Sequence, residues 1–404
     1  MGPLKDIKIF DLTRVLAGPH CTQILGDLGA DIIKIERVEN GDDTRKFAPP
    51  FMKDQNGDDT NQSAYFSGTN RNKRSLTLDL SSSEGQAIAK ELISKSDILV
   101  ENFKVGTLKK YNLDYDSLKD EFPGLIYCSI TGFGQTGPYA NRPAYDALVQ
   151  AMGGVMSLTG EPDGEPMKVG VSIADLMAGM YATVSVLAAL RHRDKTNEGQ
   201  HLDISMLDAH VAWLANQGMN YLATGKNPQR LGNQHPNILP YQVMPSKDGY
   251  FVLSVGNDAT FERFCEVASC EYLLEDKKFA EAVQRVKNRE EVTNKLNEIT
   301  KMHETKWWLE KLEAKNIGCC AINTLEEVFS DPQVISREMV LNMEGTDEKK
   351  SPYKLIANPI KMREGSITYR YPPPQHGEHT TELLKEYLDY SDEKIDALKK
   401  SGII

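Results

Sequence analysis

Short apolar runs alternate with amphipathic stretches through the first 200 residues of the chain. Runs rich in β-branched residues predict strands at 7–12, 31–36, 75–80, 97–100 and 125–130. Between them, apolar residues at helical spacing predict helices at 20–28 and 82–94. This alternation is typical of an α/β domain in which helices cover a parallel sheet. Ligands bind such sheets at the carboxyl ends of the strands, so we expect a site in the segments that follow these strands.

The pattern changes in the second half of the chain, where the strands become fewer. The apolar spacing predicts one strand at 201–205. It predicts helices at 176–191, 206–223, 258–268, 290–300, 305–315, 380–388 and 391–400. A loop rich in Gly, Asn and Pro spans 225–240, and the stretch from 250 to 317 predicts a smaller α/β unit.

Composition and charge narrow the class of protein. The chain has 404 residues, of which 40% are hydrophobic and 26% charged, as in ordinary soluble globular proteins. The net charge of −11 disfavours binding to nucleic acid or to an anionic membrane, so neither is expected as a partner. The apolar runs are short and interrupted, so we expect no helix that spans a membrane.

Processing and redox signals point to an intracellular protein. The first predicted strand begins almost at once and leaves no room for a signal peptide, and the six cysteines form no Cys-x-x-Cys pair. We therefore expect reduced thiols and a cytoplasmic location, or the mitochondrial matrix if a transit peptide has been removed.

Two motifs suggest chemistry that the surrounding residues do not support. Gly132–Gly137 has the Gly-x-Gly-x-x-Gly pattern of dinucleotide sites, but Pro138 follows and no helix is predicted to begin there. We interpret it as a glycine-rich turn. His376-Gly377-Glu378-His379 has no third ligand at a usual spacing, so no metal site is expected.

Asp175 is the acidic residue with the most interesting position. It follows the apolar stretch 169–174 and precedes a helix of small residues. At a helix start, backbone N–H groups favour the ionised carboxylate, which would then be a nucleophile at neutral pH. A plain N-cap is the alternative from position alone. Basic residues near the predicted strand ends are either a polyphosphate site or solvated charges.

Several segments carry a resemblance to a known family. The chain resembles the class III CoA-transferases, also called the CaiB/BaiF family, in order and over nearly its whole length. The residues that carry it are 11–19, 29–37, 41–45, 70–75, 100–103, 132–138, 142–146, Ala174-Asp175 and 377–380.

The resemblance implies a fold, a domain organisation and an assembly. A large Rossmann-like domain with a parallel sheet would comprise residues 1–205, completed by 325–404. A linker helix and glycine loop would span 206–249, and a small α/β domain 250–324. Two subunits would form an interlocked homodimer, like linked rings. No tightly bound cofactor is implied, since coenzyme A enters as the acyl-CoA substrate.

The resemblance also implies a mechanism and a binding site. Asp175 would attack the acyl-CoA thioester, forming a mixed anhydride and then an aspartyl-CoA thioester. The residues that would bind CoA are Leu16, Ala17, Arg37, Leu78, Asn102, Phe103, Lys104, Lys110, Arg142 and Tyr145. Gly232, Asn233 and Gln234 resemble a loop that shields the intermediate.

Three functions remain to be compared. The resemblance favours transfer of CoA to a short dicarboxylate of the oxalate, succinate or glutarate type. A 2-methylacyl-CoA racemase is the alternative, but it needs two acid/base groups, and racemases of the family have histidine where this chain has Tyr145. A phenol, which normally ionises near pH ~10, suits that role poorly. A non-catalytic CoA-binding protein is disfavoured because Asp175 and the glycine loops are present.

Overall fold

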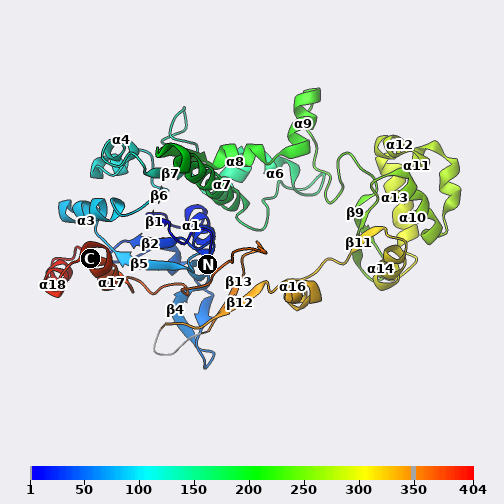
Figure 1. The fold of residues 1–404 in the computed structure, drawn as a ribbon. Coiled ribbons are helices and arrows are strands. Elements are labelled where there is room, and N and C mark those ends of the chain that lie inside the picture. Colours follow the sequence, from blue (N-terminus) through cyan, green and yellow to red (C-terminus); the bar gives the residue numbers. More distant parts are fainter. Residues whose placement is uncertain (1, 347–351) are drawn as a thin grey trace. The chain divides into compact units, whose positions relative to one another are not determined.

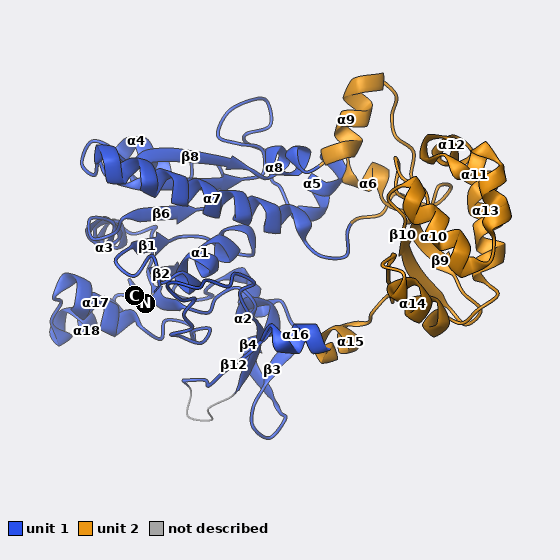
Figure 2. Cartoon of the chain, turned by 45° about the vertical axis from the view of Figure 1, so that its right-hand side comes forward, with its two compact units in different colours: residues 1–153, 169–213, 332–404 blue, residues 154–168, 214–331 orange. Residues whose placement is uncertain are grey.

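A computed structural model describes residues 2–346 and 352–404 of the chain. Contacts divide the chain into two compact units (Figure 2). Unit 1 comprises residues 1–153, 169–213 and 332–404, and unit 2 comprises residues 154–168 and 214–331. The chain therefore leaves and re-enters unit 1 twice.

A six-stranded parallel sheet forms the centre of unit 1 (Figure 1). Its strands are β1 (Lys8–Asp11), β2 (Asp31–Glu36), β5 (Lys73–Thr77), β6 (Ile98–Glu101), β7 (Ile126–Thr131) and β8 (Gln200–Ser205). The spatial order is β5-β2-β1-β6-β7-β8, and every neighbouring pair is parallel. The predicted α/β class with a parallel sheet is confirmed. The order reverses between β1 and β6, and open α/β sheets bind ligands at that switch point.

Helices cover both faces of this sheet, because successive side chains of each buried strand point to opposite sides. Ile9 packs with α1 (Ala17–Asp27) and α7 (Ile173–Thr196) in one core, whereas Phe10 packs with α3 (Ser83–Ile93) in the other. The remaining elements of unit 1 are η1 (Asp43–Lys46), β3 (Phe51–Lys53), β4 (Asp59–Ser63), α2 (Ala64–Ser67), η2 (Leu108–Tyr111), α4 (Tyr115–Leu118), α5 (Asp146–Met152), α8 (Met206–Ala212), α16 (Pro332–Ser336), β12 (Val340–Met343), β13 (Tyr353–Ile356), α17 (Thr380–Leu388) and α18 (Asp392–Lys400).

Helix α7 is longer than predicted, because it spans 173–196 and not 176–191. Among the described residues it is the helix whose length and composition would let it cross a membrane, with a mean hydropathy of 1.7 in its most apolar window. In this structure 44% of that window is buried, against α1, β7 and β8. The expectation about membrane spans rests on continuous apolar runs, and the apolar runs within this window are interrupted.

Unit 2 is built on an antiparallel sheet of β9 (Tyr241–Pro245), β10 (Tyr250–Ser254) and β11 (Gly318–Cys320). Phe251, Phe264 and Trp308 stack in its core. Its helices are α6 (Val155–Leu158), α9 (Ala215–Thr224), α10 (Asp258–Ala268), η3 (Glu271–Glu275), α11 (Lys277–Ala280), α12 (Ala282–Lys287), α13 (Arg289–Thr300), α14 (Thr305–Ala314) and α15 (Leu325–Ser330). The predicted helix 206–223 is wrong, because α8 ends at Ala212 and α9 begins at Ala215, in the other unit.

The C-terminal tail is fixed to strand β5 by the residues that resembled a metal motif. Gly377 donates its backbone N–H to the Ser75 hydroxyl at 2.9 Å, and His379 Nδ1 accepts the Ser75 N–H at 3.2 Å. Thr380 accepts the Thr77 N–H at 3.0 Å. These polar groups therefore attach α17 to the edge of the sheet.

Candidate active site

Two loops meet at the switch point of the sheet, one after β1 and one after β6. Asn102 links them, because its Oδ1 accepts the Arg14 N–H at 2.9 Å and its Nδ2 donates to the Arg14 carbonyl at 2.7 Å. Asn102, which is one of the residues predicted to bind CoA, therefore also has a structural role. It holds the loop after β1 in a fixed position relative to β6.

The loop after β1 contains a strained residue. Val15 has φ +70°, a left-handed conformation that β-branched residues rarely adopt. Its N–H donates to Asp42 Oδ1 at 3.3 Å, and the buried Lys34 ammonium bridges Asp42 and the Thr13 carbonyl, both at 2.9 Å. Burial alone would raise the pKa of Asp42, but Lys34 and hydrogen bonds from Thr44 lower it to about 2. A charged, buried anchor thus holds the strained turn.

Small residues bring α7 against the start of α1. A Cβ added to Gly179 would lie 2.6 Å from the Ala17 carbonyl oxygen, so only glycine permits this approach. Ala174, Ala178 and Ala182 are buried on the same helix. The close packing places the carboxylate of Asp175 near the Ala17 N–H, which acts to lower its pKa.

Asp175 is not the N-cap that its position alone also allowed. Helix α7 begins at Ile173 with Ser172 as its N-cap, so Asp175 lies in the first turn and is no cap. Burial and the charge of Asp146 raise its pKa to about 7, and the Ala17 N–H opposes them only in part. The helix start is therefore not the main influence on the pKa of this carboxyl. Desolvation and a like charge outweigh the helix end.

Tyr65 and Asp146 lie near Asp175 but are not among the site residues predicted from the sequence. Burial and the nearby Asp175 raise the pKa of Tyr65, and Ser172 opposes them in part. Asp146 lies one residue after the predicted Tyr145, at the start of α5. No local pattern marks Tyr65, because it reaches the site from the short helix α2.

A cavity of about 320 Å³ opens at Asp175. It contains seven of the predicted site residues, which reach it from α1, α7 and the loops after β6 and β7. Its lining includes Arg14, Val15, Ala17, Asp43, Asn102, Phe103, Lys104, Arg142, Tyr145 and Asp175. The nucleophile, the cationic side chains and the start of α1 thus share one space.

A second cavity, of about 710 Å³, lies alongside the first. It contains the predicted Arg37 and Leu78, and Arg14 and Phe103 line both cavities. The Arg14 guanidinium lies 5.3 Å from the centre of the Phe103 ring. Asp43 pairs with Arg14 at 3.1 Å and with Arg37 at 2.5 Å. Two guanidinium groups therefore stand where the cavities adjoin.

Other predicted residues lie outside these two cavities. Leu16 is buried and lines neither, and Lys110 is exposed on η2 and lines neither. Gly232, Asn233 and Gln234 belong to unit 2. There Gly232 has φ +57° and donates its N–H to the Gly160 carbonyl at 3.1 Å, and Arg289 donates to Gln234 Oε1 at 3.1 Å.

The glycine motif that follows β7 is a turn. Gly134 and Gly137 have φ +84° and +92°, and the next helix, α5, begins only at Asp146. A Cβ on Gly132 would lie 2.0 Å from the Ala144 Cβ. These glycines therefore serve close packing and turn geometry, and the helix start that a dinucleotide site requires is missing from this loop.

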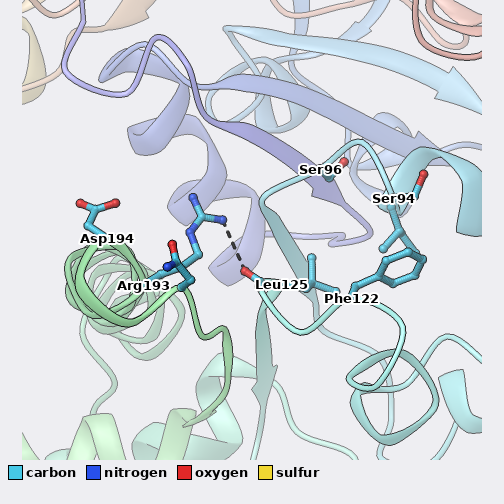
Figure 3. A pocket seen from close by; sticks show the side chains of 9 residues that line it. Ser94, Ser96, Phe122, Leu125, Arg193 and Asp194 are labelled. Carbon is cyan, nitrogen blue, oxygen red and sulfur yellow. Dashed lines mark hydrogen bonds between the residues drawn. The ribbon is translucent and has the colours of Figure 1, made fainter.

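A cavity of about 540 Å³ lies at the opposite edge of the sheet, where β6 and β7 begin. Figure 3 shows Arg193 reaching from α7 towards the loop before β7, where it donates to the Gly124 carbonyl at 3.4 Å. Arg193 also pairs with Asp97 at 3.0 Å. Because ligands of parallel sheets bind at the carboxyl ends of the strands, we place the candidate site at Asp175 and not here.

Comparison with known proteins shows the family to which the chain belongs. The model of CoA-transferase family III matches residues 4–380. The succinate–glutarate CoA-transferase of Agrobacterium fabrum is 45% identical over 384 residues, covering 95% of each chain. The human succinyl-CoA:glutarate CoA-transferase is 38% identical, covering 100% of this chain and 90% of that protein.

A solved structure gives the same result for the fold. The crystal structure of a CaiB/BaiF family protein from Brucella suis is 43% identical, with a TM-score of 0.83 over 96% of this chain and 99% of that one. The chain belongs to CoA-transferase family III and is a CoA-transferase. The resemblance found in the sequence is thereby confirmed.

Proposed function

We propose that this enzyme transfers CoA from a short dicarboxylyl-CoA to a free dicarboxylate, with the four-carbon and five-carbon acids succinate and glutarate as its preferred pair. The observation that carries the proposal is the cavity that joins Asp175, the start of α1 and three cationic side chains, Arg14, Lys104 and Arg142. The names of the two relatives support the choice of acids.

Acyl-CoA would lie across the two adjoining cavities. The adenosine end fits the larger one, where Leu78 offers an apolar wall and Arg37 a cation for phosphate. The pantetheine arm would pass Phe103 and bring the thioester beside Asp175. Arg14 and Arg37 would bind phosphate groups once these compete with Asp43 for the guanidinium groups.

The reaction would proceed through covalent intermediates on Asp175. The ionised carboxylate attacks the thioester carbonyl, the C–S bond breaks, and CoA thiolate leaves a mixed anhydride behind. The thiolate then attacks the Asp175 carbonyl, releases the donor carboxylate and forms an aspartyl-CoA thioester. The acceptor carboxylate attacks that thioester, and the returning thiolate takes the acceptor acyl group from the second anhydride. No step consumes water, so the thioester bond energy is retained.

Backbone geometry would stabilise these steps. The Ala17 N–H, which lies near the Asp175 carboxylate, would face the oxyanion formed when CoA thiolate adds to the aspartyl carbonyl. It projects from the first turn of α1, where the helix dipole adds positive potential. The strained turn at Val15, anchored by Asp42 and Asn102, would keep that N–H in position.

Arg142 would select a dicarboxylate. Its guanidinium lines the cavity together with Tyr145 and lies 4.6 Å from the centre of the Tyr139 ring. A second carboxylate on the acceptor would pair with this cation while the first carboxylate attacks the intermediate. The racemase alternative requires a second proton carrier at Tyr145, which is 70% exposed.

The shielding loop and the assembly complete the proposal. Gly232, Asn233 and Gln234 would cover the intermediate, supported by the left-handed Gly232 backbone. An interlocked homodimer is supported by apolar side chains that α7 exposes, among them Met180, Tyr181 and Val184, the last 59% exposed.

An acceptor panel tests the proposal. Succinyl-CoA is supplied with glutarate, oxalate, carnitine or butyrate, and the acyl-CoA products are quantified by mass spectrometry. We expect glutaryl-CoA to form fastest and butyryl-CoA slowest. Oxalyl-CoA as the main product would contradict the choice of acids, and no product with any acceptor would contradict the proposed function.

A matched pair of variants separates the nucleophile from the fold. Asp175→Ala should abolish transfer. Asp208→Ala is its control, because Asp208 occupies the same position in the first turn of α8, is exposed, and lies outside the cavity at Asp175. Turnover retained by Asp175→Ala would refute the assignment of the nucleophile.

A further inference from the structure

Helix α5 holds the segment that leads into the nucleophile. Asp146 Oδ1 accepts the Ala174 N–H at 2.8 Å, and Asp146 Oδ2 accepts Gln150 Nε2 at 2.7 Å. The fully buried Gln150 in turn accepts the Val169 N–H through Oε1 at 2.8 Å. Two side chains one helical turn apart therefore bind both ends of the segment 169–174, and Asp175 is the next residue.

This arrangement does more than a normal helix cap does. Ser172, the N-cap of α7, makes no capping hydrogen bond with its side chain. The N–H of Ala174, one of the first free donors of α7, is instead satisfied by a carboxylate from a different helix. The first turn of α7, and Asp175 within it, is thus oriented by α5.

Asp146 also brings a negative charge close to Asp175. Of the groups that surround Asp175, α2 contributes the phenol of Tyr65, and α1 contributes the Ala17 N–H. Helix α8 contributes His210, whose pKa is lowered by burial, so that it adds no cation near Asp146 at neutral pH. The other charged side chains that line the cavity are Arg14, Asp43, Lys104 and Arg142. Burial and Asp146 are the causes that raise the pKa of Asp175.

We propose that Asp146 is a positioning residue that orients the Asp175 carboxylate and, through its charge, makes that carboxylate a more basic nucleophile. The inference rests on the proposed function. A more basic carboxylate is a better nucleophile towards a thioester carbonyl, and it is a poorer leaving group when the anhydride is attacked. A neighbouring charge therefore brings the aspartyl intermediates closer in energy to the acyl-CoA substrate.

Two variants separate the charge of Asp146 from its hydrogen bond. Asp146→Asn keeps an oxygen that can accept the Ala174 N–H but removes the charge. Gln150→Met is the matched control, because it breaks the hydrogen bonds to Asp146 and Val169 while leaving the charge in place. Circular dichroism establishes that each variant is folded.

The readout is the pH dependence of kcat/KM. Wild type should lose activity below a midpoint near pH 7, since Asp175 must be ionised and its pKa is about 7. Asp146→Asn should move that midpoint to lower pH by roughly one unit, as expected when a close like charge is removed. Gln150→Met should lower kcat without moving the midpoint. A midpoint that stays in place in Asp146→Asn, or moves equally in both variants, would overturn the inference.

A second measurement does not depend on turnover. Carbodiimide couples protonated carboxyl groups to an amine, so the pH dependence of Asp175 labelling, followed by peptide mass spectrometry, reports its ionisation directly. We expect the labelling midpoint to fall by the same amount in Asp146→Asn. If wild type is active and the labelling midpoint of Asp146→Asn equals that of wild type, the role of Asp146 is refuted but the proposed function is not. If wild type is inactive, the proposed function is refuted, and the labelling experiment still tests the role of Asp146.

Discussion

Replacing Asp175 with asparagine should stabilise the protein at alkaline pH. The folded structure raises the pKa of Asp175 from 3.8 to about 7, through burial and the charge of Asp146. A carboxyl whose pKa is raised by folding binds its proton more tightly in the folded than in the unfolded state. Wild type therefore loses stability as pH rises from about 4 to about 7, and the loss is complete above pH 8. Asparagine keeps the shape and carries no charge.

The structure sets the size of the effect. Each pKa unit corresponds to about 1.4 kcal/mol, so a rise of about three units gives an upper limit of about 4 kcal/mol. The side chain lines a cavity that opens to solvent, and screening there reduces the expected gain to roughly 1–3 kcal/mol. Asp175→Asn also removes a negative charge that is favourable in the first turn of α7, which reduces the expected gain by about a few tenths of a kcal/mol.

Calorimetric melts between pH 5 and pH 8.5 measure this gain. The apparent Tm of Asp175→Asn should exceed that of wild type by an amount that grows with pH and levels off above pH 8. Asp208→Asn, at the matching position of α8, should show no such growth. A gap that is constant or shrinks as pH rises would refute the assignment of a raised pKa to Asp175.

Three further predictions concern the turn, the acyl pocket and the assembly. Val15→Gly should be more stable than Val15→Ala by about 1 kcal/mol in urea unfolding, because the left-handed backbone strains every residue except glycine; equal stabilities would contradict the strain. Tyr145→Phe should slow transfer only about two- to thirteen-fold, the cost of one neutral hydrogen bond of about 0.5–1.5 kcal/mol. Rapid exchange of the α-proton of 2-methylacyl-CoA with deuterium, abolished by that change, would instead favour the racemase. Sedimentation at nanomolar concentration should show a dimer, because linked rings cannot separate without unfolding, and a monomer would contradict the assembly.

The parallel sheet could be predicted from the sequence because its strands are buried on both faces. Runs such as Ile98-Leu99-Val100 are apolar on consecutive positions and therefore stand out against the helices. The break between α8 and α9 could not be predicted, because the residues there, Trp213 and Leu214, include neither glycine nor proline. The chain bends there as it passes from one unit to the other, a tertiary effect without a local signal.

The sequence is a better guide to which residues lie at the site than to their pKa values. Asp175 stands out by its place before a helix of small residues, but its role as nucleophile is implied by the family resemblance. The structure explains the small residues by the close approach of Gly179 to α1. Its pKa is raised by burial and by Asp146, which lies 29 positions earlier in the chain and on another helix. Local spacing contains no information about such a contact.

The covalent aspartyl-CoA intermediate is the central claim, and mass spectrometry tests it most directly. The enzyme is incubated with succinyl-CoA in the absence of an acceptor, digested, and its peptides are mapped. We expect CoA to be attached through a thioester to the peptide that contains Asp175. The adduct should be removable by hydroxylamine, present in Asp208→Ala and absent in Asp175→Ala. An active enzyme that carries no adduct, or carries it on another residue, would contradict the account.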